Sequence, residues 1–289
     1  YLDGTFGGGG YSEAILDRAD CRVIGLDRDP DAIARGQALQ GFYGARLRLI
    51  EGRFGEMDDL VTEQVDGIVL DLGVSSFQLD EADRGFSFRF DAPLDMRMSR
   101  DGPSAADAVN KLSETALADV LFFLGEEAGA RRIARALVQE RARAPIETTK
   151  QLADTIERAL GGRNGAKTHP ATQSFQALRV LVNNELDELA TGLAAAERLL
   201  RPGGALVVVS FHSLEDRLVK TFFAERSGAR DGGGSRHMPE LPVGPPPTFE
   251  TPVRKGIGPS DDEAKANPRA RSAHLRWGKR TTTPARGRL

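Results

Sequence analysis

The sequence of 289 residues contains a single cysteine, Cys21, so no disulfide can form within the chain. One cysteine in a chain of this length is typical of a reducing compartment, and we expect a cytoplasmic protein. The histidines are also few and are not spaced as metal ligands, which predicts that no structural metal is bound. They are His169, His212, His237 and His274.

Long hydrophobic runs are absent as well. The longest apolar stretch, Ala205 to Phe211, is far shorter than the ~20 residues that a helix needs to span a bilayer, so no membrane role is predicted. No charged segment followed by an apolar one opens the chain, as a secretory signal would. Because Tyr1 already belongs to an expected β-strand, we expect the natural protein to begin further upstream.

A strong net charge is also missing, since the formal value is only −3, which is not typical of a protein that binds nucleic acid. Salt screens distant charges, however, so local clusters matter more than the sum. Residues 264–289 hold eight Lys or Arg and no acid, and residues 131–143 hold five Arg and one Glu. Each cluster could contact RNA, and each could equally be a solvated helix face or a disordered tail.

The first ninety residues alternate short apolar runs of β type with helical patterns, which indicates βαβ units and an α/β fold with a mostly parallel sheet. Asp29 and Pro30 supply the cap and the first position of the second helix. The first expected strand ends at Leu2, and the next three cover residues 21–26, 47–50 and 67–70. The expected helices cover residues 12–18 and 30–39.

From residue 99 to residue 171 the pattern changes to helices only, which predicts a helical lobe inserted in the α/β domain. One of these helices starts at Thr149 and ends before Gly161. A long amphipathic run follows from Phe175 to Leu200, with Gly192 as the place where a break is expected.

The sheet resumes with a strand over residues 205–210 and ends with an antiparallel strand over residues 272–277. Between them, residues 226–248 are rich in Gly and Pro and predict a mobile loop. The predicted domains are therefore residues 1–98 with 172–289, and the inserted residues 99–171.

The segment DGTFGGGG, residues 3–10, lies where the first strand turns into the first helix. Glycines let the backbone approach a ligand closely and turn sharply into a helix whose N-terminus faces that ligand. Asp27 closes the second strand 24 residues after Asp3, where a carboxylate can accept both ribose hydroxyls. Together these features predict an adenosine-containing cofactor, although each alone also fits a tight turn or a surface acid.

Two cofactor classes use such a crevice, the dinucleotides and S-adenosylmethionine. The glycines here lack the dinucleotide spacing and follow an acid, Asp3, which suits a sulfonium cation and favours S-adenosylmethionine. Phe54 follows the third strand, well placed to lie against an adenine ring. Asp71 ends the fourth strand at the mouth of the crevice and begins the polar segment DLGVSSFQ.

Further motifs follow in order along nearly the whole chain. They are DGTFG at 3–7, DRDP at 27–30, DLGVSS at 71–76, RGFSF at 84–88 with PLDMRM at 93–98, HPAT at 169–172 with FQA at 175–177, SFHSLEDR at 210–217 and NPRARS at 267–272. In these motifs the chain resembles the RsmH (MraW) family of bacterial 16S ribosomal RNA cytosine-N4 methyltransferases. The resemblance implies a class I, Rossmann-like methyltransferase fold and a substrate in the decoding centre of the small ribosomal subunit.

The resemblance also implies which residues contact S-adenosylmethionine. They are Gly9, Gly10, Tyr11, Asp27, Phe54, Asp71 and Gln78. The chain departs from the family's pattern at two positions, because Tyr11 stands where the family usually has His and Phe77 where it usually has Pro. At Tyr11 a backbone contact is still expected, whereas the side-chain contact and the loop conformation at Phe77 stay open.

The residues also bear on the methylated atom. Carbon 5 of cytosine generally needs a cysteine nucleophile, and Cys21 opens the second strand at the end remote from the crevice mouth. An exocyclic amine can instead attack the methyl group directly when it is held in place and its protons are accepted. We therefore predict that Asp71 and neighbouring carbonyls hold the amine, with His212 lining the pocket, although His212 could equally serve only to cap the helix near Ser213.

A target base must leave its stack to reach a buried methyl group. Basic residues of the helical lobe and of the C-terminal segment are therefore expected to bracket the RNA backbone. They are Arg131, Arg132, Arg135, Arg141, Arg143, Arg269 and Arg271.

Two other functions stay open at this point. A nicotinamide-dependent oxidoreductase would be stabilised by NAD and not by S-adenosylhomocysteine. A ribosome-assembly factor with a vestigial pocket would show no turnover, and the intact run Gly7 to Gly10 together with Asp27 and Asp71 argues against it.

Overall fold

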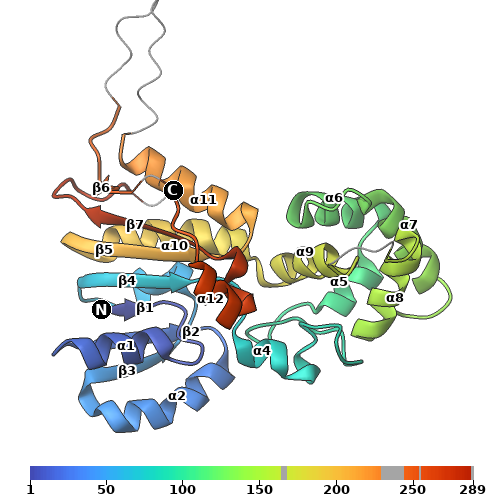
Figure 1. The fold of residues 1–289 in the computed structure, drawn as a ribbon, viewed down its shortest axis with the longest axis horizontal. Helices are drawn as coiled ribbons and strands as arrows, with labels where there is room; N and C mark the ends of the chain where they lie inside the picture. Colours follow the sequence, from blue (N-terminus) through green and yellow to red (C-terminus); the bar gives the residue numbers. More distant parts are fainter. Residues whose placement is uncertain (164–167, 229–243, 254, 288–289) are drawn as a thin grey trace, which may run out of the picture. The chain divides into compact units, whose positions relative to one another are not determined.

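The computed structural model describes residues 1–163, 168–228, 244–253 and 255–287. The chain forms two compact units, Tyr1–Gly73 with Leu186–Leu289 and Val74–Glu185, and each is described by itself (Figure 1). Among the described residues, no helix combines the length and the apolar character needed to cross a membrane.

The first unit is built on a seven-stranded sheet of order β3-β2-β1-β4-β5-β7-β6 (Figure 1). Strands β1 to β5 are parallel to one another, and β7 is antiparallel to both β5 and β6. The sheet thus confirms the predicted α/β fold and the antiparallel strand near its end. The strands are β1 (Leu2–Asp3), β2 (Val23–Asp27), β3 (Leu47–Glu51), β4 (Val65–Asp71), β5 (Leu200–Ser210), β6 (Phe249–Glu250) and β7 (His274–Arg280).

Helices cover both faces of this sheet. Ile24 and Leu26 of β2 pack in the larger apolar cluster with Leu193, whereas Val23 packs in a separate cluster with Leu16. Successive side chains of a strand point to opposite faces, so α10 and α1 lie on opposite sides. The helices of this unit are α1 (Gly10–Arg18), α2 (Pro30–Tyr43), α3 (Met57–Leu60), α10 (Glu185–Leu199), α11 (Ser213–Arg226) and α12 (Asp261–Ala266).

The second unit is helical and has its own core, which includes Leu121, Ile133 and Leu152. Helix α8 begins after Thr148 and is stopped by Gly161 in the left-handed conformation (φ 85°), as predicted. The helices are α4 (Ser76–Asp80), α5 (Ala105–Lys111), α6 (Glu114–Gly125), α7 (Ala130–Arg141), α8 (Thr149–Leu160) and α9 (Thr172–Asn183).

This unit is wider than the predicted insertion 99–171, because it also takes in residues 74–98 and 172–185. Long-range contacts explain the difference. The Asn183 side chain accepts a hydrogen bond from the Met98 amide (2.8 Å) and donates one to the Met96 carbonyl (2.7 Å). Met96 and Met98 are buried in the helical core, so the segment before residue 99 folds with the helices.

The amphipathic run from Phe175 to Leu200 is broken, but the expected break at Gly192 was wrong. Helix α9 ends at Asn183, and Asn184 takes the left-handed conformation with φ 51°. Gly192 lies inside α10, where an added Cβ would come within 2.3 Å of the Phe54 ring. The glycine therefore allows close packing and does not stop the helix.

Two further differences concern the C-terminal third. The sequence patterns did not predict β6, which consists of two residues paired with β7. Most of the predicted mobile loop 226–248 lies outside the described residues. Its first residue, Arg226, is still the last residue of α11.

Candidate active site

Three carboxylates stand at the carboxyl ends of neighbouring parallel strands. Asp3 ends β1, Asp27 ends β2 and Asp71 ends β4. Asp3 pairs in register with Gly25 and Val69, so Asp27 and Asp71 each lie two residues further along their strands. The edge where these strands end is where open α/β sheets bind ligands.

The glycine loop folds around Asp27. One oxygen of its carboxylate accepts a hydrogen bond from Gly7 N (2.7 Å) and the other from Asp29 N (2.8 Å). Gly9 has φ 82°, and a Cβ there would meet the Phe6 ring at 2.8 Å, so this position requires glycine. Helix α1 begins at the next residue without a side-chain cap, which leaves the first amides of the helix open to a ligand.

Asp3 is completely buried and is held by two donors. Ser12 Oγ donates to its carboxylate (2.8 Å), and Thr5 N donates as well (3.3 Å). Burial, with a smaller contribution from the nearby Asp27 charge, raises the pKa of Asp3 to about 6 in spite of these hydrogen bonds. The pKa of Asp27 is also raised, mainly by burial, against the opposing effect of its backbone donors.

Asp71 is the least satisfied of the three acids. Its Oδ1 is buried and finds no hydrogen-bond partner in the part of the chain that the structure describes. Burial, together with the charges of Asp3 and Glu215, raises the pKa of Asp71 to about 7. The Asp71 amide donates to Thr5 Oγ1 (2.7 Å), which fixes the end of β4. Such a carboxyl group suits a ligand that brings positive charge or hydrogen-bond donors.

Tyr11 lies in the first turn of α1 and is 40% exposed. Partial burial raises the pKa of its phenol to about 12, with further contributions from Asp71, Asp3 and Glu263. The phenol therefore lies near the carboxylates and stays protonated at neutral pH. The contribution of Glu263 shows that α12 also approaches this position.

The segment after β5 is anchored by a buried glutamate. Glu215 Oε2 accepts hydrogen bonds from the amides of Phe211 (2.9 Å) and His212 (3.3 Å). Its other oxygen lies 3.1 Å from His212 Nε2. His212 is the N-cap residue of α11, so the structure confirms its expected capping position. Glu215 was not among the predicted site residues, although its place three residues after the cap is the signal of a capping box.

Phe54 and Gln78 have structural partners of their own. Phe54 begins the short helix η2 (Phe54–Glu56) after β3, and its ring packs against Gly192. Gln78 belongs to the second unit, where its side chain accepts a hydrogen bond from Ser75 N (3.0 Å) in a capping box at the start of α4. The expected contacts of both residues with a cofactor remain predictions.

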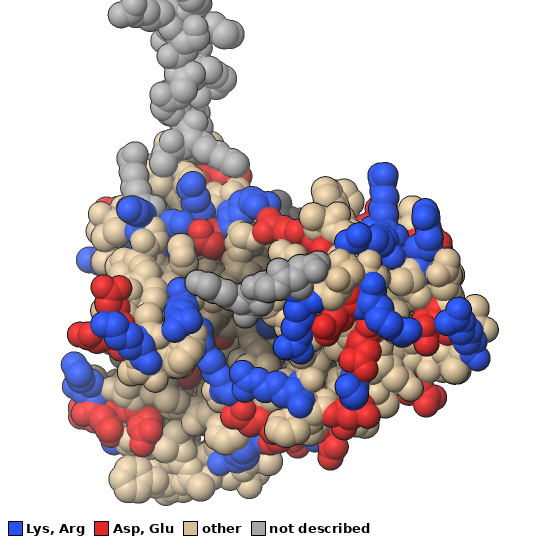
Figure 2. All heavy atoms as spheres, turned by 45° about the vertical axis from the view of Figure 1, so that its right-hand side comes forward, with Lys and Arg blue, Asp and Glu red and all other residues tan. Residues whose placement is uncertain are grey.

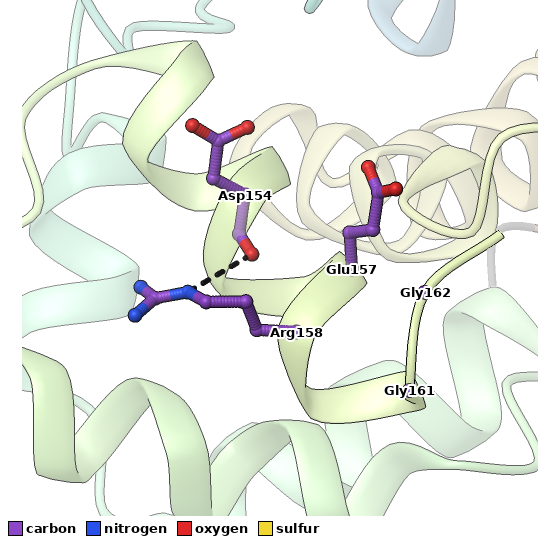
Figure 3. A pocket seen from close by; sticks show the side chains of 5 residues that line it. All are labelled: Asp154, Glu157, Arg158, Gly161 and Gly162. Carbon is purple, nitrogen blue, oxygen red and sulfur yellow. Dashed lines mark hydrogen bonds between the residues drawn. The ribbon is translucent and has the colours of Figure 1, made fainter.

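A separate hollow of about 630 Å³ lies in the helical unit at the end of α8 (Figure 3). Its acids already have basic neighbours, since Lys150 lies 3.3 Å from Asp154 and Arg163 lies 3.5 Å from Glu157. We therefore assign no site to it. It is lined by Asp154, Glu157, Arg158, Gly161 and Gly162.

The fold and the three acids at the carboxyl ends of its strands, which are the residues of the predicted crevice, together define a class I methyltransferase that uses S-adenosylmethionine. The chain belongs to the MraW methylase family, whose sequence pattern matches residues 1–281. It is 59% identical to Ribosomal RNA small subunit methyltransferase H of Hyphomonas neptunium, over 98% of this chain and 84% of the relative. It is 56% identical to the protein of the same name from Rhodopseudomonas palustris strain TIE-1, over 99% and 86%.

Among solved structures, an rRNA methylase from Streptococcus thermophilus shows a TM-score of 0.38 at 10% identity, over 97% of this chain and 86% of that chain. This likeness is too distant to inform the site.

The residues of the crevice fit the cofactor of the family. S-adenosylmethionine carries a sulfonium and an ammonium group. Burial raises the pKa values of Asp3 and Asp71, and no basic side chain among the described residues acts against this effect, so a cationic ligand would be the first positive charge beside them. The unpartnered Asp71 Oδ1 matches a ligand with donors or a cation. Open amides at the start of α1 and the carboxylate of Asp27 suit the remaining polar groups.

Proposed function

We propose that the chain transfers a methyl group from S-adenosylmethionine to the N4 amine of a cytidine in the decoding region of 16S ribosomal RNA. The substrate is the small ribosomal subunit in the cytoplasm. One observation carries this proposal above the others: Asp71 Oδ1 is buried and has no hydrogen-bond partner among the described residues, at the carboxyl end of β4. The names of the relatives supply the class of RNA.

The cofactor would be held by backbone and side-chain groups of the first unit. The amides that follow Gly9 and Gly10 would contact the cofactor, and Asp27 would accept the ribose hydroxyls. Phe54 would lie along the adenine and Tyr11 at the mouth. A cofactor contact of Gln78 rests on the family resemblance alone. Bound S-adenosylmethionine supplies an electrophilic methyl carbon.

The chain's own residues would activate the amine. The N4 lone pair of cytosine is delocalised into the ring, so the amine attacks only when acceptors hold its hydrogens and turn the lone pair toward the methyl carbon. The nitrogen–carbon bond forms as the sulfur–carbon bond breaks, and the amine then loses one proton. Asp71 is the proposed acceptor, because its pKa of about 7 suits proton uptake at neutral pH. His212 would line the pocket.

The single cysteine does not support a covalent route to carbon 5. Cys21 precedes the first residue of β2, whereas Asp27 closes that strand at the crevice edge. Its thiol lies 3.9 Å from the Ile15 carbonyl. A strand's length therefore separates Cys21 from the site, and N4 methylation needs no such nucleophile.

The structure distinguishes the arginines that were expected to contact RNA. Arg141 donates to the Val109 carbonyl (2.6 Å) and is committed to the fold of the helical unit. Arg135 lies 3.6 Å from Glu114 and Arg143 lies 3.7 Å from Glu140, so both have an acidic neighbour. Figure 2 shows Lys and Arg side chains interspersed with Asp and Glu on the visible face. Any contact with phosphate would therefore depend on individual arginines.

Arg131 and Arg132 differ from these three arginines. Both are exposed, and neither has an ion pair within the ranges that the structure describes. In the first unit, Arg269 and Arg271 flank the buried Ala270 in η4 (Pro268–Ser272). We propose that these four arginines make the main phosphate contacts.

The decisive experiment supplies methyl-labelled cofactor with small subunits from cells that lack the modification, with free 16S RNA and with protein. The RNA is then digested and the labelled nucleoside identified. We expect N4-methylcytidine, with small subunits as the better substrate. Label in another nucleoside or in protein would contradict the proposal. Stabilisation by NAD and not by S-adenosylhomocysteine would favour the oxidoreductase, and cofactor binding without turnover would favour an assembly factor.

A further inference from the structure

Two adjacent phenylalanines on α6 are exposed to solvent. Phe122 is 56% and Phe123 is 63% exposed, and their rings contact each other edge to face with centroids 5.1 Å apart. The other side of α6 is packed, since Leu117 and Leu121 are fully buried. Because the two rings lie outside the core of the unit, folding does not explain their presence.

Two arginines lie at the same end of the helix pair. Helix α6 ends at Gly125, α7 begins at Ala130, and the two helices pack against each other, so the last turn of α6 and the first turn of α7 are neighbours. Arg131 and Arg132 occupy that first turn and are exposed. The helix dipole opposes cations there, so helix stability does not explain these arginines either.

We propose that Phe122, Phe123, Arg131 and Arg132 form an aromatic platform that binds unpaired nucleotides of the RNA substrate. Every base has a π face that can stack on an aromatic ring, and guanidinium groups attract the backbone phosphates. A single-stranded segment offers both groups, and the target base of the proposed reaction must itself be unstacked. The inference rests on the proposed function, because it requires an RNA substrate.

The charge around the platform indicates that stacking supplies much of the binding. Asp119 on α6 and Glu126, the residue that follows this helix, are exposed acids that offset the two arginines. Positive charge alone therefore does not make this surface bind every polyanion. The two rings would have to distinguish unpaired bases from duplex RNA. A basic protein segment is the competing occupant, and it would use the rings as an apolar surface only.

The first test replaces both rings at once, as Phe122→Ala/Phe123→Ala. The matched control is Phe42→Ala, which removes a ring that is 80% exposed on α2 of the other unit. Stacking of one base on an aromatic ring typically corresponds to a change of about 5- to 150-fold on alanine substitution. We expect KM for small subunits and Kd for deproteinised 16S RNA to rise within that range. The turnover number and the stabilisation by S-adenosylhomocysteine should match the control.

A second variant separates stacking from apolar docking. Phe122→Leu/Phe123→Leu keeps an apolar surface and removes the π faces, so it should lose as much RNA affinity as the alanine pair. Wild-type behaviour of the leucine pair would overturn the platform in favour of a protein contact. An unchanged Kd of the alanine pair for deproteinised RNA would overturn it as well. If the wild-type chain methylated no RNA, the proposed function itself would fail, which is a different result from normal methylation by both variants.

Discussion

The crevice and the helical unit carry charge in different ways. In the crevice, Asp3, Asp27 and Asp71 share one sign, are largely buried and have raised pKa values. In the helical unit, charges of both signs are exposed and several are paired, such as Arg135 with Glu114. A buried cluster of one sign is a poor way to stabilise a fold but a good way to hold a cationic ligand. The exposed mixture suits weak contacts spread over a large substrate.

The largest expected effect comes from Asp71. If it accepts the amine proton, Asp71→Ala should lower kcat by about 10²–10⁴-fold, the range in which general bases contribute. Methyl transfer to small subunits at saturating cofactor measures this change. The control is Asp66→Ala on the same strand, where the side chain is exposed and lies 3.3 Å from Arg201. Full activity of the Asp71 variant would show that another group takes the proton.

The glycine loop offers a matched pair of neighbours. Gly9→Ala places a methyl group 2.8 Å from the Phe6 ring at a position with φ 82°, whereas a Cβ at Gly10 has nothing within 4 Å. Left-handed backbone costs an alanine roughly 1–2 kcal/mol, so a Gly9→Ala loop that relaxes out of this conformation should bind S-adenosylhomocysteine about 5- to 30-fold more weakly. Calorimetric titration compares the two variants. Equal affinities would show that the loop tolerates a side chain.

Local sequence signals predicted much of the crevice. Asp29 caps α2 through Asp31 N, and Pro30 follows it, as the sequence pattern indicated. Asp27 and Asp71 were placed at strand ends because an apolar run stops at each of them. Such features depend on a few consecutive residues, so a single sequence carries them.

Long-range contacts account for what the sequence did not reveal. The edge of the helical unit depends on Asn183 bonding to Met96 and Met98, which are more than eighty residues away. Gly192 is explained by the Phe54 ring on another element. The burial of Asp71 Oδ1 depends on the elements that surround it in the folded structure, so the sequence alone does not predict it.

Replacing Arg131 and Arg132 should have a smaller effect than Asp71→Ala or Gly9→Ala. Arg131→Glu/Arg132→Glu is expected to weaken RNA binding across sequences and to lower the slope of log K against log salt by about 1 for each lost phosphate contact. Arg143→Glu is the control, because Glu140 lies 3.7 Å from that guanidinium. Binding is followed at several salt concentrations with the cofactor site saturated. An equal loss of slope in the control would mean that the contacts are not specific to α7.

The smallest effect concerns the pH dependence of the crevice. The pKa of Asp71 is raised to about 7 and that of Asp3 to about 6, from an ordinary value of 3.8. Between pH ~4 and ~7 the folded protein therefore binds more protons than the unfolded chain. The apoprotein should lose stability as pH rises through this range. Asp71→Asn removes part of this loss, so its Tm should exceed that of the wild type at pH ~8, with a difference that shrinks toward pH ~4.

The same ionisation should distinguish two ligands that differ in charge. Both ligands carry an ammonium group, but only S-adenosylmethionine adds a positive sulfur, so it gains more attraction than S-adenosylhomocysteine as Asp71 and Asp3 lose their protons. We expect the ratio of the two affinities to shift a few-fold toward S-adenosylmethionine between pH ~6 and ~8, and less so in Asp71→Asn. An identical pH dependence for both ligands would mean that these carboxylates do not face the sulfonium, and the contrast between the crevice and the helical surface would then need another cause.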